Sequence, residues 1–283
     1  MRAIVITKPG GPEVLAAVDR PRPEPSRGEV RVRVRATAVN RADLLQRMGA
    51  YPAPADAPAD IPGLELAGEV DALGPGVERL AIGDRVFGLV GGGSYAEAIV
   101  THERALAKIP DGLSFEDAAA IPEAFITAHD AVAVQAALRP GEHLLVHGAA
   151  GAVGSAAVQI GVQMGARVMG VVRHERGREL MHSLGATPVD DDDFAAAVAQ
   201  HTGGHGADVV LELVGAPHFP ANLEAVATRG RIVVVGVGRR GDHGLVAPAA
   251  AAEAGEPARH RATGSSARGK AAALRAFERE VIP

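Results

Sequence analysis

The residues best suited to chemistry lie in a glycine-rich segment, Ala149–Gly154, which reads Ala-Ala-Gly-Ala-Val-Gly. The apolar run Leu144–Val146 before it is typical of a buried strand, and Val153–Met164 after it predicts a helix. Small residues let the backbone approach phosphate oxygens, and the first N–H groups of a helix attract negative charge. The segment therefore predicts a pyrophosphate site, with a plain tight turn as the alternative because 35 residues of the chain are glycine. The predicted binding residues are Ala150, Gly151, Ala152, Val153 and Gly154.

A basic cluster, Arg173, His174 and Arg176, follows the next predicted strand, Arg167–Val172. A site for NAD usually has an acidic residue at this place, where it holds the ribose diol. Arginine and histidine side chains suit instead the dianionic 2′-phosphate of NADPH. The cluster therefore predicts NADPH as the cofactor. Glu175 lies within the cluster, and a basic start to an exposed helix is the alternative interpretation.

Strand and helix patterns alternate around this turn, as they do in a doubly wound parallel sheet. Further strands are predicted at Ala207–Leu213 and Arg231–Gly236. Residues 1–110 are instead rich in strand patterns alone. Arg31–Arg35 alternates charged and apolar residues, which predicts a half-buried antiparallel strand whose arginines face solvent rather than form an anion site. The chain is therefore predicted to be an α/β protein with a separate β-rich domain.

Helical patterns connect the two predicted parts. Ser114–Asp117 resembles a capping box, and a longer helix is predicted over Glu123–Ala137. Ala247–Gly255 shows no strand pattern, so the last strand of the parallel sheet is expected to be missing. The predicted domains, in chain order, are a catalytic or substrate domain at 1–122, a dinucleotide-binding domain at 123–240, and an atypical, partly disordered tail at 241–283.

The composition excludes several classes of partner. With a net charge of −5, the chain is not expected to bind nucleic acid or an anionic membrane surface. No apolar run approaches the roughly 18 residues that a membrane span requires. The apolar stretch near the N-terminus is too short to predict a signal peptide. A cytoplasmic protein is therefore expected.

The chain has no cysteine, which excludes disulfides, thiol nucleophiles and cysteine-ligated metals. Its 11 histidines form no H-E-x-x-H pattern. His201 and His205 lie among glycines and are interpreted as part of a flexible loop. The acidic run Asp190–Asp193 is interpreted as a solvated turn, because it lacks the spacing of a calcium loop. No metal-ligating residues are therefore predicted.

Several separated motifs occur in an order that is familiar from one superfamily. The chain resembles the medium-chain dehydrogenases/reductases, and among them the zinc-independent NADPH:quinone oxidoreductases, the zeta-crystallin-like group. This resemblance implies a chaperonin-10-like β-rich domain, a Rossmann domain, a cleft between them and a homodimer. The motifs that carry it are Lys8–Leu15, Asn40–Asp43, Pro62–Gly68, Gly83–Val86 and Ala149–Gly154.

The resemblance also implies roles for single residues. Zinc alcohol dehydrogenases of the superfamily carry a cysteine where this chain has Asn40 and a histidine where it has Leu64, so a catalytic zinc is not expected. Asn40 is expected near the nicotinamide. Asp43 is expected to order its loop or to cap a helix over Leu44–Met48. Tyr51 is expected to contact the substrate. The residues expected at the cofactor in addition to the glycine turn are Thr127, Gly236 and Val237.

Without a Lewis acid, the expected reaction is hydride transfer from NADPH to an acceptor that is already electron-poor, such as a quinone or a related enone. One alternative is an enoyl-thioester reductase of the same superfamily. That reaction requires a proton donor at the α-carbon, for which Tyr51 and Tyr95 are the tyrosine candidates. A second alternative is a catalytically weak NADPH-binding protein.

The C-terminal part of the sequence favours this second alternative. The resemblance fades after about Gly238 and returns at Lys270–Glu280, as expected either for an interval read out of frame or for a divergent insertion. Family members continue for a few dozen residues beyond the position of Pro283. The chain is therefore expected to be truncated, less stable than full-length relatives and impaired as a homodimer.

Overall fold

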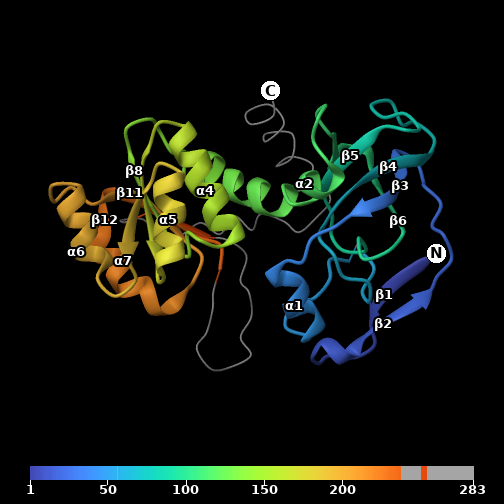
Figure 1. The fold of residues 1–283 in the computed structure, drawn as a ribbon, viewed down its shortest axis with the longest axis horizontal. Helices are drawn as coiled ribbons and strands as arrows, with labels where there is room; N and C mark the ends of the chain where they lie inside the picture. Colours follow the sequence, from blue (N-terminus) through green and yellow to red (C-terminus); the bar gives the residue numbers. More distant parts are fainter. Residues whose placement is uncertain (56, 237–249, 254–283) are drawn as a thin grey trace. The chain divides into compact units, whose positions relative to one another are not determined.

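The computed structural model describes residues 1–55, 57–236 and 250–253. The chain divides into two compact units, one containing Met1–Ile126 and the other beginning at Thr127 (Figure 1). The boundary lies within a continuous helical stretch that runs through Pro122–Ile126, α3 (Thr127–His129) and Asp130–Gln135. The first and last of these segments are π-helical turns, a form that is rare and often found at functional sites. The helix predicted over Glu123–Ala137 is therefore present, but most of it is π-helical rather than α-helical.

The first unit is built on antiparallel strands, as predicted. A five-stranded sheet has the order β6-β3-β4-β5-β7, and β1 pairs with β2 in a separate two-stranded sheet. Among the described residues of this unit, two short α-helices accompany the sheets, and short 3₁₀ turns lie at Pro12–Val14 and Glu103–Ala105. The elements of this unit are β1 (Arg2–Ile6), β2 (Leu15–Asp19), β3 (Glu29–Ala36), α1 (Arg41–Arg47), β4 (Glu65–Leu73), β5 (Arg85–Leu89), β6 (Ala98–His102), β7 (Leu106–Lys108) and α2 (Phe115–Ala119).

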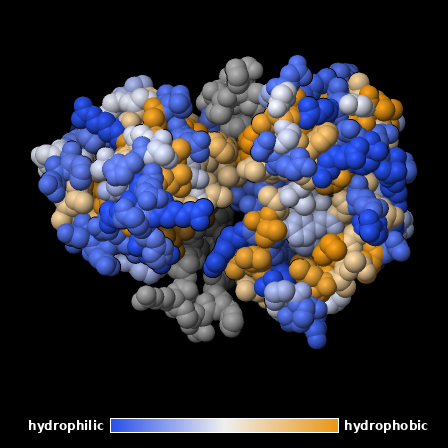
Figure 2. Space-filling model, in the orientation of Figure 1, coloured by the Kyte–Doolittle hydropathy of each residue, from blue (hydrophilic) through white to orange (hydrophobic). Residues whose placement is uncertain are grey.

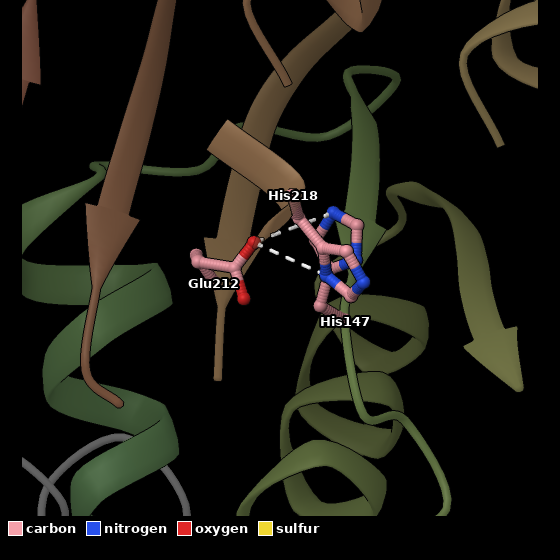
Figure 3. A group of neighbouring side chains, drawn as sticks. All are labelled: His147, Glu212 and His218. Atoms are coloured by element: carbon pink, nitrogen blue, oxygen red, sulfur yellow. Dashed lines mark ion pairs between the residues drawn. The ribbon is translucent and has the colours of Figure 1, made fainter. Parts of the chain in front are cut away.

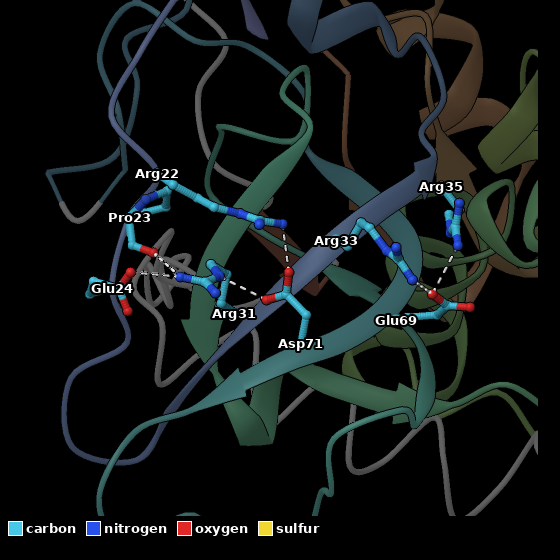
Figure 4. Close-up of polar contacts among 8 residues, drawn as sticks. All are labelled: Arg22, Pro23, Glu24, Arg31, Arg33, Arg35, Glu69 and Asp71. Carbon is cyan, nitrogen blue, oxygen red and sulfur yellow. Dashed lines mark hydrogen bonds and ion pairs between the residues drawn. The ribbon is translucent and has the colours of Figure 1, made fainter. Parts of the chain in front are cut away.

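The alternating strand β3 has its two faces in different surroundings. Val30 and Val32 are fully buried in a core shared with Leu66 and Val86. Arg31, Arg33 and Arg35 lie on the opposite face, because successive side chains of a strand alternate. Their guanidinium groups pair with carboxylates: Arg31 with Asp71 and Glu24, and Arg33 and Arg35 both with Glu69 (Figure 4). These pairs agree with a solvated strand face rather than an anion site.

The second unit contains the predicted parallel sheet. Its six strands have the order β10-β9-β8-β11-β12-β13, and the first five of these run parallel. Helices α6 and α7 pack against one side of β9–β12 through a core that includes Val171, Phe194, Val198 and Val210. A 3₁₀ turn lies at Ala216–His218. The elements of this unit after α3 are β8 (His143–Val146), α4 (Ala152–Gln163), β9 (Arg167–Val172), α5 (Glu175–Ser183), β10 (Thr187–Asp190), α6 (Phe194–His201), β11 (Ala207–Glu212), α7 (Phe219–Ala225), β12 (Val226–Val234) and β13 (Ala250–Glu253).

The prediction that no strand lies within Ala247–Gly255 is wrong. Ala250–Glu253 forms β13, which pairs antiparallel with β12, Ala252 lying opposite Ile232. The edge of β12 offers unpaired N–H and C=O groups, so backbone hydrogen bonds can hold a short strand that lacks β-branched residues. Val237, most of the predicted tail at 241–283 and the predicted boundary at 240 lie outside the described residues.

On the face of the molecule that Figure 2 shows, polar side chains predominate, and apolar side chains gather around α1. Val39, Leu44 and Met48, which precede, belong to and follow this helix, are all exposed. No helix in the described ranges combines the length and the apolar character that crossing a bilayer requires.

Candidate active site

The glycine-rich turn connects β8 to α4 at the carboxyl end of the parallel sheet. Gly148 has a φ of 57°, and the N–H of Gly151 donates to its carbonyl oxygen at 2.9 Å. A Cβ on Gly154 would lie 2.3 Å from that same oxygen, so only glycine fits at this position. The N–H groups in the first turn of α4 have no acceptor within the helix. The turn is therefore tight, open to solvent at Ala150 and Gly151, and shaped as the predicted pyrophosphate site requires.

The basic cluster lies beside this turn. Arg173, His174 and Arg176 are exposed where β9 ends and α5 begins. Neither Arg173 nor Arg176 forms an ion pair within the part of the chain that the structure describes, whereas Arg178 pairs with Asp190 and lies 3.9 Å from Glu175.

Gly177, one turn into α5, is buried, and a Cβ there would lie 3.5 Å from the Cβ of Ala150. The first turn of α5 is therefore close to the glycine turn. This brings the cationic side chains near the predicted phosphate site.

The other residues expected at the cofactor occupy different places. Thr127 begins α3 and is half-buried. Gly236 follows β12, and a Cβ there would lie 2.4 Å from the carbonyl oxygen of Leu213. Its N–H donates to the carbonyl oxygen of Glu212 at 3.3 Å, which holds the end of β12 against β11.

In the first unit, Asn40 and Asp43 form the start of α1. Asn40 is the N-cap, and its N–H donates to Oδ2 of Asp43 at 2.8 Å in a capping box. The expectation that Asp43 caps a helix over Leu44–Met48 is therefore wrong, because the helix begins earlier. The other expected role is present: Asp43 also accepts from the N–H of Gly63 at 3.1 Å and from the Tyr95 hydroxyl at 3.2 Å. One carboxylate thus ties the helix to two separate loops.

Glu65 is a residue of this site that the sequence analysis did not select. It is buried at the start of β4, and its Oε1 accepts from Nδ2 of Asn40 at 2.7 Å. Its Oε2 accepts from the backbone N–H of Glu123 at 2.8 Å. The sequence could have indicated Glu65 because it is a carboxylate between two apolar residues, Leu64 and Leu66. An acidic residue that is buried in an apolar strand requires hydrogen-bond partners.

Glu123 is the second residue that was missed, because the sequence suggested only a helix start. Burial, together with the negative charges of Glu65 and Asp43, raises the pKa of Glu123 to about 7. Burial and the charges of Glu123 and Asp43 also raise the pKa of Tyr51. The pKa of Tyr95 is raised by burial and by Asp43. Within this group, Glu123 is the carboxyl able to exchange a proton near neutral pH.

The same geometry does not fit a catalytic zinc. The amide of Asn40 is engaged with Glu65, and the Leu64 side chain is a buried hydrocarbon that offers no lone pair. Zinc in proteins is held by thiolate, imidazole or carboxylate ligands. The arrangement instead fixes an amide and leaves a proton-exchanging carboxyl close to a tyrosine.

Two family models match the chain: an alcohol dehydrogenase GroES-like domain over residues 26–111 and a zinc-binding dehydrogenase over residues 152–264. A quinone oxidoreductase from Pseudomonas aeruginosa is 39% identical over 231 residues, which make up 80% of this chain and 70% of that protein. This chain belongs to the quinone oxidoreductase group of the medium-chain dehydrogenase/reductase superfamily. The resemblance carried by the separated motifs is confirmed, and so are the GroES-like and Rossmann folds.

Members of the superfamily also occur within larger enzymes. A pikromycin polyketide synthase component from Streptomyces venezuelae is 40% identical over 237 residues, which are 81% of this chain but 6% of that protein. The chain thus spans only a small part of the polyketide synthases that it matches.

Two solved structures of the superfamily are similar along most of the chain. An NAD-dependent alcohol dehydrogenase is 38% identical with a TM-score of 0.78, covering 87% of this chain and 80% of its own. A mycobacterial protein complexed with NADPH is 35% identical with a TM-score of 0.77, covering 84% of this chain and 74% of its own. The chain thus belongs to an oxidoreductase superfamily whose members bind nicotinamide cofactors.

Proposed function

We propose that this chain transfers hydride from NADPH to a quinone or a related enone without a catalytic zinc ion. The observation that carries the proposal is the hydrogen-bonded group of Asn40, Asp43, Glu65 and Glu123, which stands where the resemblance places a metal centre in alcohol dehydrogenases. Oxidation of an alcohol requires stabilisation of an alkoxide, which zinc supplies. An electron-poor acceptor does not require that stabilisation.

The choice of NADPH rests on the arginines of the second unit. Arg173 and Arg176 are exposed, unpaired with carboxylates of the described chain, and close to the glycine turn. Guanidinium groups bind a phosphate dianion through charge-assisted hydrogen bonds. When bound, the cofactor supplies a hydride. The backbone of the glycine turn would hold its pyrophosphate, and the arginines would select its 2′-phosphate.

The first unit supplies positioning and a proton. The side-chain amide of Asn40 is fixed by Glu65. Its backbone N–H donates to Oδ2 of Asp43, and its backbone carbonyl oxygen accepts from the N–H of Asp43 at 3.1 Å. Reduction of a quinone to a hydroquinone adds one hydride and one proton, and the proton goes to a quinone oxygen. Glu123, with a pKa of about 7, can deliver that proton, with Tyr51 as an intermediate donor. The exposed apolar side chains around α1 suit an apolar acceptor.

Enoyl-thioester reduction is the second candidate, because polyketide synthase segments are among the relatives. In that reaction the proton goes to the α-carbon of the substrate. The sequence offered Tyr51 and Tyr95 as donors. Tyr95 already donates toward Asp43 and the Ala38 carbonyl oxygen, so Tyr51 and Glu123 are better suited to the role.

The experiment is NADPH oxidation, followed by absorbance, with a series of benzoquinones and naphthoquinones and with a short enoyl thioester. Turnover with quinones alone supports the proposal, and turnover with the thioester alone supports the second candidate. NADPH binding by calorimetry without turnover on any acceptor would reject both in favour of a binding protein. A cytoplasmic location and an impaired homodimer stay predictions.

A further inference from the structure

Two histidines and a glutamate meet at the carboxyl end of the parallel sheet (Figure 3). His147 directly follows β8, Glu212 ends β11, and His218 closes the 3₁₀ turn at Ala216–His218. β8 and β11 are neighbouring parallel strands, so their carboxyl ends lie at the same edge of the sheet. Residues far apart in sequence are thereby brought together, which their spacing could not reveal.

The candidate ligand atoms of the three side chains all lie within 4.8 Å of one another, somewhat farther apart than around a bound tetrahedral metal ion. Nε2 of His147 lies 3.7 Å and Nδ1 of His218 lies 3.6 Å from the same oxygen, Oε2 of Glu212. The two imidazole rings are 4.6 Å apart between centroids. Zinc bonds of about 2.1 Å in tetrahedral geometry place neighbouring ligand atoms about 3.4 Å apart. A small contraction of the group would therefore enclose an ion.

The cluster is mostly buried, and Nδ1 of His147 and Nδ1 of His218 lack a hydrogen-bond partner among the described residues. His147 and Glu212 are 0% and 1% exposed. Nδ1 of His218 is buried without a hydrogen-bond partner among the described residues, although it faces Oε2 of Glu212. Buried polar atoms almost always have a partner, and an orphaned one requires an explanation. A cation between the imidazole and the carboxylate would satisfy it.

Neighbouring residues hold the three side chains in orientation. Nε2 of His218 lies 3.2 Å from Oδ1 of Asp191, which directs Nδ1 towards Glu212. Oε1 of Glu212 accepts from the N–H groups of Val214 and Gly215 at 2.6 and 2.8 Å. Oε2, which faces the histidines, also accepts from Nδ2 of Asn222 at 2.7 Å. Histidines that bind metals are commonly fixed in this way by a carboxylate on their other nitrogen.

We propose that His147, Glu212 and His218 form a binding site for a divalent transition-metal ion with the preferences of Zn²⁺. Ion binding would replace the 2.7 Å hydrogen bond between Nε2 of His147 and Oδ1 of Asn222 and release the Nε2 proton. This site is separate from Asn40 and Leu64 and has no part in hydride transfer. It ties β8 to the turn that precedes α7, directly behind Gly148, and so stiffens the base of the glycine turn.

The test begins with protein stripped by a chelator and titrated with Zn²⁺ by calorimetry, and with Co²⁺ by visible absorption, which reports tetrahedral coordination. The unmodified chain should take one ion per chain. His218→Gln should weaken Zn²⁺ affinity by at least about 100-fold, and Asp191→Asn by about 10- to 100-fold. Zn²⁺ should raise the melting temperature of the unmodified chain and not that of His218→Gln.

The matched control is the double variant His201→Gln/His205→Gln, which removes two exposed histidines of the same unit. It should keep both the stoichiometry and the affinity. Loss of binding in this control, or unchanged binding in His218→Gln, would overturn the proposal in favour of a surface site. An unmodified chain that takes up no ion would show the cluster to be purely electrostatic. If His218→Gln does not fold, Asp191→Asn decides, because its side chain is partly exposed.

Discussion

The carboxyl groups of Asp43, Glu65 and Glu123 share one buried region of the first unit. The charge of Asp43 raises the pKa of Glu65, and the charges of both raise the pKa of Glu123. Burial raises the pKa of Asp43 and of Glu65, each of which also accepts hydrogen bonds that favour its charged form. No hydrogen bond from a described residue to the Glu123 carboxylate offsets its burial, and its pKa is raised to about 7. Glu123 is therefore the carboxyl of this group that is partly protonated near neutral pH.

Glu123→Gln should change the pH dependence of stability. The pKa of Glu123 is raised from 4.5 to about 7 in the folded state, so between these values the folded chain binds more protons than the unfolded one. Its contribution is therefore fully present below about pH 4.5 and is lost as the pH rises to about 7. The variant should gain up to about 3 kcal/mol over the unmodified chain between pH 5 and pH 8. Urea unfolding at both pH values measures this, and an equal difference at the two would contradict the assignment.

Tyr51→Phe should lower turnover on quinones about tenfold, equivalent to about 1.4 kcal/mol of transition-state stabilisation, with little change in NADPH affinity. The hydroxyl lies near the charges of Glu123 and Asp43 and is a proton donor in the proposed reaction. Tyr95→Phe is the matched control. It removes a hydroxyl bonded to Asp43 and should cost about 1 kcal/mol of stability rather than turnover. Unchanged quinone kinetics in Tyr51→Phe would make Tyr51 a loop anchor.

Arg173→Ala/Arg176→Ala should remove the preference for NADPH over NADH. We expect the unmodified chain to bind NADPH at least about tenfold more tightly, as one charge-assisted hydrogen bond of about 1.5 kcal/mol would produce. Arg178→Ala is the control, because Arg178 already pairs with Asp190. Dissociation constants from fluorescence titration are the measurement, and equal constants in the unmodified chain would reject NADPH selection.

At the scale of elements, two glycines of the turn between β8 and α4 have different roles. Gly154 allows close backbone packing, and Gly151 lies at the exposed surface of the turn. Gly154→Ala would place a Cβ 2.3 Å from the Gly148 carbonyl oxygen and 2.8 Å from the Ala149 Cα, both of them backbone atoms. Overpacking of this kind should cost about 1–3 kcal/mol of stability. Gly151→Ala meets the same oxygen at 3.2 Å and is exposed, so it should weaken NADPH binding with little loss of stability. Thermal melts and titrations of the two variants measure the contrast, which would be refuted by equal stability.

Elements with strong periodicity were predictable from the sequence. β9 occupies the residues expected for it, because a run of branched apolar residues between turns leaves little choice. β13 was not predictable, since its alanines carry no strand preference and its pairing depends on the edge of β12. The start of α1 was placed too late, because a capping box can be read with either of its polar residues as the cap.

The candidate site was predictable only in part, for a related reason. Asn40, Asp43 and the glycine turn belong to local patterns in which spacing indicates geometry. Glu65 and Glu123 come together through β4 and a helical turn far along the chain. His147, Glu212 and His218 likewise meet only because two parallel strands are neighbours. Contacts between distant segments depend on the topology, which single-residue patterns do not contain.

At the scale of the whole molecule, each compact unit has cores of its own. Residues of β3, β4, β5 and β7 bury one set of apolar side chains in the first unit. Strands β8–β12 with α6 and α7 bury another in the second. Chains with several cores commonly depart from two-state unfolding. The predicted nucleotide site and the proposed metal site both belong to the second unit, so ligands should act on its stability first.

We therefore predict that the two units unfold in separable transitions. Both tyrosines of the chain, Tyr51 and Tyr95, lie in the first unit, and there is no tryptophan, so tyrosine fluorescence reports the first unit alone. Calorimetry reports both. NADP⁺ at 100 times its dissociation constant should stabilise the second unit by about 2.7 kcal/mol and raise its calorimetric transition, leaving the tyrosine transition in place. The variant Arg173→Ala/Arg176→Ala is the control and should show a smaller shift. A tyrosine transition that moves together with the calorimetric one would show that the units unfold as a single cooperative body.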